Sequence, residues 1–291
     1  SADPAAFGFL GPSVPLEVRG ANLSVDANAT LGLAARDILL DGAVLSAHGG
    51  KVDIKATDTL HLVDSTVQTL PAGRGAPGPI SIVGGEIVLE RSTVGSYNLS
   101  GRAAGPIYMN TLGGDLHMDG SLVESVAYLS GSGGDIRLAA RNISLAGGSR
   151  VFSRSSAPVG GSIYLNAEEA FLAYGMNDRG YGSQVYTLAE NWGNAGNVNV
   201  QANRVELFDG AQIGSLAMGA GYGGMVGLLA RDIHIAGTDA MGFPSALISE
   251  SLATGDAGFI TVSAENLTLA DGGSISAATV GTMPGAGMGG S

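Results

Sequence analysis

Aromatic and polar residues between positions 163 and 194 form the part of the chain best suited to bind a ligand. Only 5% of the chain is aromatic, yet this stretch holds four tyrosines and the single tryptophan. Aromatic rings on an exposed loop can stack on sugar rings, while nearby amide and charged groups hydrogen-bond sugar hydroxyls. The alternative is an insertion that packs on itself and covers an edge of the fold. The candidate ligand-binding residues are Tyr174, Asn177, Asp178, Arg179, Tyr181, Tyr186 and Trp192.

Three histidines could suggest a metal site, because His61, His117 and His234 occupy the same slot of a repeat described below. The closest two are separated by two repeats, or about 10 Å at the spacing of neighbouring strands. Zn–N bonds are near 2 Å, so these side chains cannot share one ion. We therefore expect exposed single histidines and no metal site.

Carboxylates could act as an acid and base pair, as they do in polysaccharide lyases, if they gathered in one groove. Asp115, Asp119, Glu124 and Asp135 come nearest to a cluster. Acidic residues are otherwise spread over most repeats, which favours a solvated acidic face. We expect no catalytic residues and no enzymatic activity.

Glycine-rich patterns of the dinucleotide-binding type, G-x-G-x-x-G, occur three times. None follows a strand and opens a helix, as that chemistry requires. We interpret them as turn glycines and expect no cofactor. The three patterns are Gly73-Gly75-Gly78, Gly219-Gly221-Gly224 and Gly285-Gly287-Gly290.

Composition excludes several other classes of protein. The net charge is −12, from 14 basic and 26 acidic residues, so nucleic acid would be repelled. No apolar run approaches the roughly 18 residues that span a membrane. The chain has no cysteine, which removes disulfides and thiolate chemistry and suits export in an unfolded form.

A repeat positions all of these residues. A pair of apolar residues separated by one variable residue, the pattern of a strand with one buried face, recurs eight times at intervals of 27 to 35 residues. The first members are Val52, Ile80, Ile107, Ile136, Ile163, Val198, Val226 and Ile260. A second pair follows seven to nine residues later, beginning at Leu60, Ile87, Leu116, Ile143, Ala170, Val205, Ile233 and Leu267. A third strand is centred on Val67, Val94, Val123, Val151, Val185, Ile213, Ile248 and Ile275.

These patterns predict an all-β fold, a right-handed parallel β-helix with three short strands per rung and about ten rungs, on the order of 48 Å tall. Asp-Gly pairs such as Asp209-Gly210 mark one corner, and Gly-Gly or Gly-Pro pairs mark the loop that returns to the next rung. Two rungs are longer than the rest, with insertions near 175–184 and 238–247 at the same corner, one rung apart. We divide the chain into a lead-in segment (1–15), repeats (16–282) and a glycine-rich tail (283–291).

The opening stretch Asp3-Pro4-Ala5-Ala6-Phe7-Gly8-Phe9-Leu10-Gly11 resembles filamentous-haemagglutinin-like exoproteins, in the region that follows their secretion domain. Later units, such as the one from Gly133 to Leu145, look like the haemagglutinin-type repeats of that family. The resemblance implies a β-helical passenger of a Gram-negative two-partner-secretion system. It also implies export through an outer-membrane barrel transporter, and adhesion as the typical function.

We therefore expect a single β-helical segment, 1–291, of a longer exoprotein, located outside the cell or on the outer-membrane surface. Its expected function is that of a structural and adhesive stalk, with surface glycans or receptors of a host or neighbouring cell as partners. The first alternative is an extracellular filament subunit that associates end to end, since open rungs expose unpaired strand edges. The second is a polysaccharide-binding or lyase-like β-helix.

Overall fold

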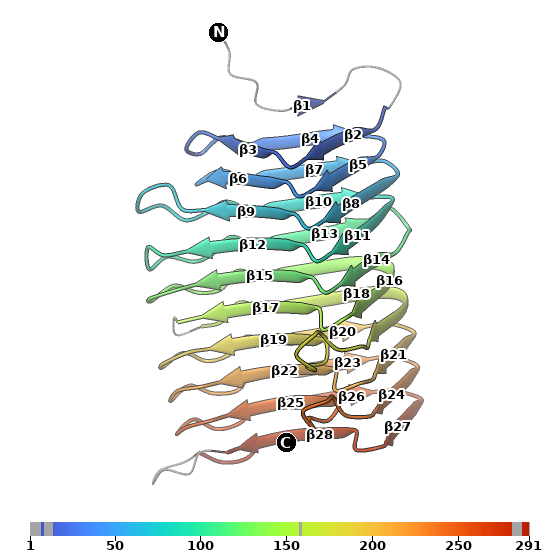
Figure 1. Ribbon diagram of the computed structural model, residues 1–291. Helices are drawn as coiled ribbons and strands as arrows, with labels where there is room; N and C mark the ends of the chain where they lie inside the picture. The colour runs from blue at the N-terminus through green and yellow to red at the C-terminus, as the bar shows by residue number, and fades with distance from the viewer. Residues whose placement is uncertain (1–6, 9–13, 157–158, 281–286, 291) are drawn as a thin grey trace.

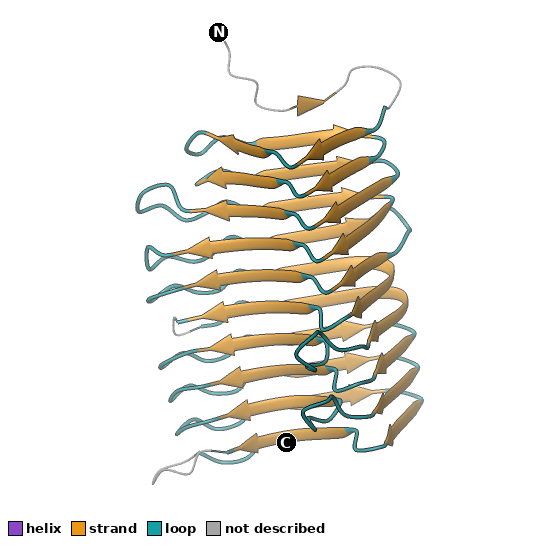
Figure 2. Ribbon diagram, viewed as in Figure 1, coloured by secondary structure: helices purple, strands orange, loops and turns teal. Residues whose placement is uncertain are grey.

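The computed structural model describes residues 7–8, 14–156, 159–280 and 287–290, which form strands, turns and no helix. Its 28 strands wind into a stack of rungs (Figures 1 and 2). Viewed from the N-terminal end, the chain turns clockwise as it recedes, so the coil is right-handed (Figure 1). The predicted right-handed parallel β-helix is confirmed. Most residues of the lead-in segment, of the opening motif and of the tail lie outside the described residues. Gly285, the first glycine of the third G-x-G-x-x-G pattern, is among them.

Each rung contributes a first, a second and a third strand. The first strands are β1 (Phe7–Gly8), β4 (Leu31–Ala35), β7 (Val52–Ala56), β10 (Ile80–Gly84), β13 (Ile107–Thr111), the first half of β16 (Ile136–Ala146), the first half of β18 (Ile163–Ala173), β20 (Val198–Gln201), β23 (Val226–Leu229) and β26 (Ile260–Ser263). The second strands are β2 (Leu16–Arg19), β5 (Ile38–Asp41), β8 (Thr59–Val63), β11 (Glu86–Glu90), β14 (Leu116–Asp119), the second halves of β16 and β18, β21 (Arg204–Leu207), β24 (Asp232–Ala236) and β27 (Asn266–Ala270). The third strands are β3 (Asn22–Val25), β6 (Val44–His48), β9 (Thr66–Leu70), β12 (Thr93–Asn98), β15 (Leu122–Ala127), β17 (Arg150–Ser155), β19 (Gln184–Ala189), β22 (Gln212–Ala217), β25 (Ala246–Ser251) and β28 (Ser274–Thr279).

Equivalent strands of successive rungs pair in parallel. First and second strands belong to one sheet, and the third strands form a separate sheet of ten. Ile136 pairs with Ile107 on one side and with Ile163 on the other, and Ile163 pairs in turn with Val198. The predicted stacking of equivalent apolar residues is therefore confirmed for the first strands.

The inward side chains form one hydrophobic core that runs the length of the stack, from Leu16 and Val18 at one end to Ile260 and Ile275 at the other. Isoleucine, leucine and valine fill it, because β-branched and aliphatic side chains pack well on a pleated surface. The core thus depends on each rung having neighbours.

The prediction for the second strand of the fifth repeat is wrong by one residue. The repeat predicts Ala170 and Leu172 as its inward pair, but Ile143 pairs with Phe171 and Leu145 with Ala173. The register shifts between β16 and β18 because β18 contains one extra residue, a β-bulge at the corner. A shift of one residue exchanges the two faces of a strand. Phe171 is therefore fully buried, and the predicted Leu172 lies on the outer face.

The third strand of the second long rung also requires a correction. The repeat predicts Ile248 as its inward residue, but Ile213 pairs with Leu247, which in turn pairs with Ile275. Leu247 is buried and Ile248 is half-buried. The two adjacent aliphatic residues fit either face by composition, and the length of the insertion before them decides which one points inward.

Polar groups that the hydrophobic pattern does not reveal hold the corner formed by the return loops. From β9 to β25, a buried serine or threonine lies two residues after the inward anchor of each third strand. Ser125 accepts a hydrogen bond from the Gly134 amide (2.8 Å) and donates one to the Gly105 carbonyl (2.9 Å), so it joins two successive return loops. Glycine is required there, because a Cβ at Gly105 would lie 2.2 Å from the Gly78 carbonyl oxygen. At the other corner, Asp209 and Gly210 both have positive φ, as predicted for a sharp turn.

Candidate functional site

The first insertion, residues 174–183 between β18 and β19, is a small hairpin at the corner of the stack. Met176 and Gly182 form an antiparallel bridge, and the Asn177 amide donates a hydrogen bond to the Tyr181 carbonyl (2.9 Å). The Asn177 side-chain oxygen accepts hydrogen bonds from the amides of Arg179 (3.0 Å) and Tyr181 (3.2 Å). The asparagine therefore fixes the turn from within, as short polar side chains commonly do.

The second insertion, residues 237–245 between β24 and β25, repeats this hairpin. Asp239 occupies the place of Asn177, and its carboxylate accepts hydrogen bonds from the amides of Met241 and Phe243, each 2.9 Å long. The glycine before the aromatic residue has positive φ in both turns, at Gly180 and Gly242. From Gly175 and Gly237 onward the two insertions align without gaps, so each residue of the first matches the one 62 positions later (239 − 177 = 62). The same alignment matches Val185 with Leu247. A comparison of the two insertions therefore predicts Leu247 as the inward residue, whereas the spacing of apolar pairs does not.

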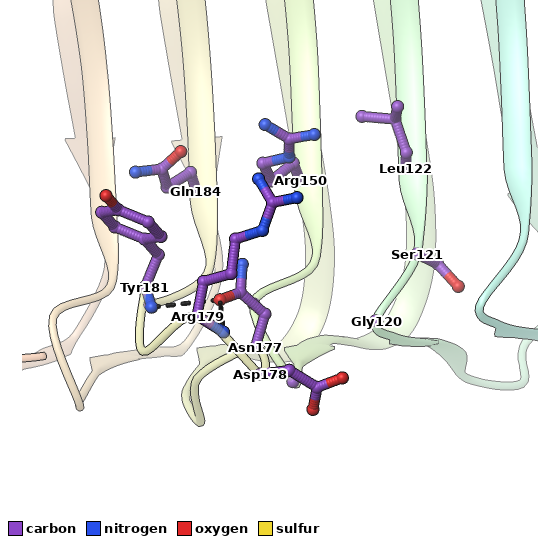
Figure 3. Close-up of a pocket in the computed structure, with 12 residues that line it drawn as sticks. Gly120, Ser121, Leu122, Arg150, Asn177, Asp178, Arg179, Tyr181 and Gln184 are labelled. Carbon is purple, nitrogen blue, oxygen red and sulfur yellow. Dashed lines mark hydrogen bonds between the residues drawn. The ribbon is translucent and has the colours of Figure 1, made fainter. Parts of the chain in front are cut away.

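A hollow of about 610 Å³ lies between the first insertion and the starts of two preceding third strands. The insertion leans over the preceding corner, where a Cβ at Gly148 would lie 2.7 Å from the Asn177 Cβ. Figure 3 shows the Arg179 side chain reaching up toward Arg150, with Tyr181 and Gln184 on the other side. The hollow is lined by Gly120, Ser121, Leu122, Gly147, Gly148, Arg150, Asn177, Asp178, Arg179, Tyr181, Gly182 and Gln184.

The hollow is lined by two arginines, Arg150 and Arg179, and by one carboxylate, that of Asp178. Most arginines in the described part of the chain lie within 4.0 Å of a carboxylate, but Arg150 and Arg179 do not. Arg150 instead lies over the Phe152 ring, 5.5 Å from its centre. The lining therefore has a net charge of +1 in a chain whose net charge is −12, and its two arginines can bind an anion.

The structure brings four of the seven predicted residues together and separates the other three. Asn177, Asp178, Arg179 and Tyr181 all line the hollow. Tyr174 lies at the base of the insertion, where its carbonyl accepts a hydrogen bond from Ser183 (3.1 Å), and it does not line the hollow.

Tyr186 and Trp192 lie away from the hollow for different reasons. Tyr186 is only 9% exposed, because it stacks with Phe152 (6.0 Å between ring centres) and donates a hydrogen bond to Gln212 (2.7 Å). Burial raises the pKa of its hydroxyl. Trp192 is 84% exposed but follows the end of β19, whereas Tyr181 precedes its start. A strand of six residues separates them, about 20 Å at 3.3 Å per residue.

Arg150 is a residue of the hollow that the sequence pattern does not indicate. It lies 27 residues before Asn177 in the chain and belongs to the preceding rung. Leu122, Arg150 and Gln184 pair in register as the first residues of β15, β17 and β19. An alignment of the third strands that includes their outward positions would identify Arg150, because it places this residue beside the insertion of the next rung.

The other groups considered for chemistry remain apart. His61 and His117 both pair with Val88, so two rungs separate them as predicted. The described residues contain no group of three histidine, cysteine, aspartate or glutamate side chains that could hold a metal ion.

The four acidic residues that come nearest to a cluster do not share a groove. Asp115 is held by Arg141 (3.1 and 3.2 Å), whose guanidinium lowers the pKa of the carboxyl. Glu124, on the sheet of third strands, accepts a hydrogen bond from the Tyr97 hydroxyl (2.8 Å). Asp135 pairs with Arg137 (3.0 Å), and Asp119 ends β14.

Comparison with protein-family models, curated proteins and solved structures finds no match to this chain. Within the described residues, no helix has the length and apolar character to cross a membrane.

Proposed function

We propose that this protein is a rigid stalk of a secreted or cell-surface exoprotein of the filamentous-haemagglutinin-like type, and that its insertion hollow binds an acidic sugar. Export through an outer-membrane barrel transporter belongs to the same proposal. The partner is a carboxylate-bearing glycan on the surface of a host or neighbouring cell. The proposal assigns no catalytic role to any residue.

The observation that carries the stalk is the unbroken core. Equivalent residues stack in register through successive rungs, and one cluster of buried side chains connects them. Such a ladder adds length with each repeat and has no hinge, because every rung between the two ends is hydrogen-bonded to both neighbours. These are the mechanical properties that a stalk needs to hold a binding site away from a surface.

The chemistry of the hollow supports an acidic sugar as the ligand. Two arginines without carboxylate partners can bind a carboxylate in a bidentate manner. Asn177, Asp178 and Gln184 can hydrogen-bond hydroxyl groups, and the exposed ring of Tyr181 offers a surface on which a sugar can stack. An anionic ligand would balance the net positive charge that two arginines and one aspartate give the lining, and a neutral ligand would not.

Glycan-array binding tests this function. We expect the protein to bind sialylated or uronic-acid-containing glycans and to lose about tenfold or more in affinity in the double variant Arg150→Gln/Arg179→Gln. Binding should also weaken as salt rises, since the interaction is electrostatic. The matched control is Arg74→Gln/Arg102→Gln, which removes two arginines that have no carboxylate within 4.0 Å among the described residues and that lie outside the hollow. Equal binding by both double variants, or no binding to any acidic glycan, would refute the assignment of the ligand.

A second candidate function, a filament subunit, is favoured by the last described rung. Leu267 and Leu269 continue the inward columns of the core, yet they are 46% and 45% exposed. A second copy stacked end to end would bury them, and so would a further rung of a longer chain. We expect larger species in sedimentation at rising protein concentration, lost in Leu269→Glu and kept in Thr268→Glu, whose side chain lies on the outer face. A single monomeric species at every concentration excludes the filament.

A further inference from the structure

A second hollow, of about 640 Å³, lies on a different face of the rod from the insertions. It runs along the outer face of four consecutive first strands, β18, β20, β23 and β26. Its outward side chains come from Tyr164, Asn166, Asn199, Gln201, Leu229, Thr261 and Ser263. We call this surface the amide groove.

An ordered aromatic ring closes one end of the amide groove. The Arg137 guanidinium lies between two tyrosine rings, 5.8 Å from the centre of Tyr108 and 4.7 Å from the centre of Tyr164. Arg137 is also held by Asp135 (3.0 Å). Tyr164 pairs with Arg137 on one side and Asn199 on the other, so one ring face is covered and the other borders the groove. Cation–π contact of this kind fixes the ring for stacking.

The amide side chains of the groove have no hydrogen-bond partner among the described residues. In the described part of the chain, the side chains of Asn166, Asn199 and Gln201 form no hydrogen bond with another residue. None of the residues that line the groove is acidic or basic. In a chain with 26 acidic residues, an uncharged strip across four rungs is a distinct surface. Its amides can donate and accept hydrogen bonds, which suits a ligand rich in hydroxyl groups.

Gly227 opens the middle of the groove. It occupies an outward position of β23, between Asn199 and Thr261 in the pairing of the strands. Its φ does not lie in the left-handed region, so the backbone does not require glycine there. The nearest atoms to a Cβ there would be the side-chain oxygens of Asn199 at 3.0 Å and Thr261 at 3.5 Å. A glycine inside a strand often marks a place where a ligand approaches the backbone closely.

We propose that the amide groove binds a neutral polysaccharide chain that lies along the axis of the rod. One sugar ring stacks on the free face of Tyr164, and the hydroxyls of the following sugars hydrogen-bond the amides of Asn199 and Gln201. Gly227 leaves room for the chain to reach the sheet. The rungs repeat about every 4.8 Å, so equivalent positions offer a regular series of contacts to a polymer with its own repeat. A peptide strand is disfavoured, because the backbone groups under the groove are already paired with neighbouring strands.

Affinity electrophoresis tests this proposal. The protein is run in native gels containing a neutral polysaccharide (dextran, galactomannan or a β-glucan) and, for comparison, polygalacturonate. We expect at least one neutral polymer to retard the protein. The dissociation constant should rise about tenfold in Tyr164→Ala and in Asn199→Ala, because each substitution removes a contact that nothing replaces.

Two further variants separate loss of binding from loss of folding. Gly227→Leu should block the groove, whereas Thr268→Leu places the same side chain on an outward position of the neighbouring face and should bind normally. Arg150→Gln/Arg179→Gln should also bind normally, so failure of the insertion site and failure of the groove are distinguishable. Retardation by polygalacturonate alone, no retardation in any neutral gel, or equal retardation of Gly227→Leu and Thr268→Leu would overturn the proposal.

Discussion

The Ala240 amide donates a hydrogen bond of 3.1 Å to the Gly180 carbonyl, and this bond joins the two insertions across the rung that lies between them. Stacking alone would leave the insertions about 10 Å apart. The tips are much closer, since a Cβ at Gly180 would lie 2.7 Å from that of Ala240. The second insertion therefore supports the first, which forms one wall of the candidate binding site.

Ala240→Pro should loosen the first insertion. Residue 240 is the second residue of a turn closed by the Gly242 amide and the Asp239 carbonyl (3.0 Å), a position that accepts proline. The substitution removes the N–H that reaches Gly180, at a cost of about 1 kcal/mol. We expect faster amide hydrogen exchange in the first insertion. The control is Asp178→Pro, which makes the same change at the equivalent position of the first turn. No hydrogen bond between the insertions is lost there, so amide exchange in the second insertion should not change. Equal exchange in wild type and Ala240→Pro would contradict a supporting role.

Phe171→Ala should strongly destabilise the protein, and Leu172→Ala should not. Phe171 is fully buried in the core, whereas its neighbour lies on the outer face. Truncation of a buried phenylalanine costs about 3 to 5 kcal/mol, and a surface change costs within about 1 kcal/mol. Urea denaturation of the two variants measures the difference. The reverse order would mean that the register follows the bare repeat and that the bulge in β18 is absent.

Ser125→Ala should destabilise the corner that it joins. The hydroxyl satisfies the Gly134 amide and the Gly105 carbonyl, both in buried return loops. Its removal leaves two backbone groups without partners, which costs about 1 to 3 kcal/mol. Ser276→Ala, at an outward position of the same sheet, is the control for denaturation and should lie within about 0.5 kcal/mol of wild type. A neutral Ser125→Ala would show that water replaces the hydroxyl.

Asp115→Asn should lower stability at neutral pH and have less effect in acid. The hydrogen bond from Arg141 lowers the pKa of Asp115 in the folded protein. Its contribution to the free energy of unfolding is therefore present above the unfolded value, about 3.9, and is lost as pH falls through the lower folded pKa. The pair is largely exposed, which limits the effect to about 1 kcal/mol or less.

Denaturation of Asp115→Asn and wild type at pH 7 and pH 3 measures this change. The control is Asp178→Asn, which removes a carboxylate that has no hydrogen bond to an arginine among the described residues. If Asp115→Asn lowers the free energy of unfolding by the same amount at both pH values, the assigned role of the Asp115–Arg141 pair is contradicted.

Much of the fold could be predicted because a parallel stack requires each rung to repeat the spacing of the last. Residues such as Ile136 and Ile163 recur at the strand period and face one core, so their pairing follows from alternation alone. The corners follow from turn chemistry at pairs such as Asp209-Gly210. The burial of serines such as Ser125 could not be predicted in this way. A polar residue in a strand is expected to face outward, and only the structure shows the loop groups that it hydrogen-bonds when it faces inward.

What the amino-acid sequence by itself determined was the coil, its handedness and the corner that carries both insertions, because these depend on local period and on steric rules for parallel strands. Only the tertiary structure decided which aromatic residues share a site. One extra residue in β18 put Phe171 inside, packing against Phe152 covered Tyr186, and the length of β19 carried Trp192 to the opposite corner. Arg150 joined Arg179 because stacking places residues of successive rungs side by side, a closeness in space that distance along the chain does not express.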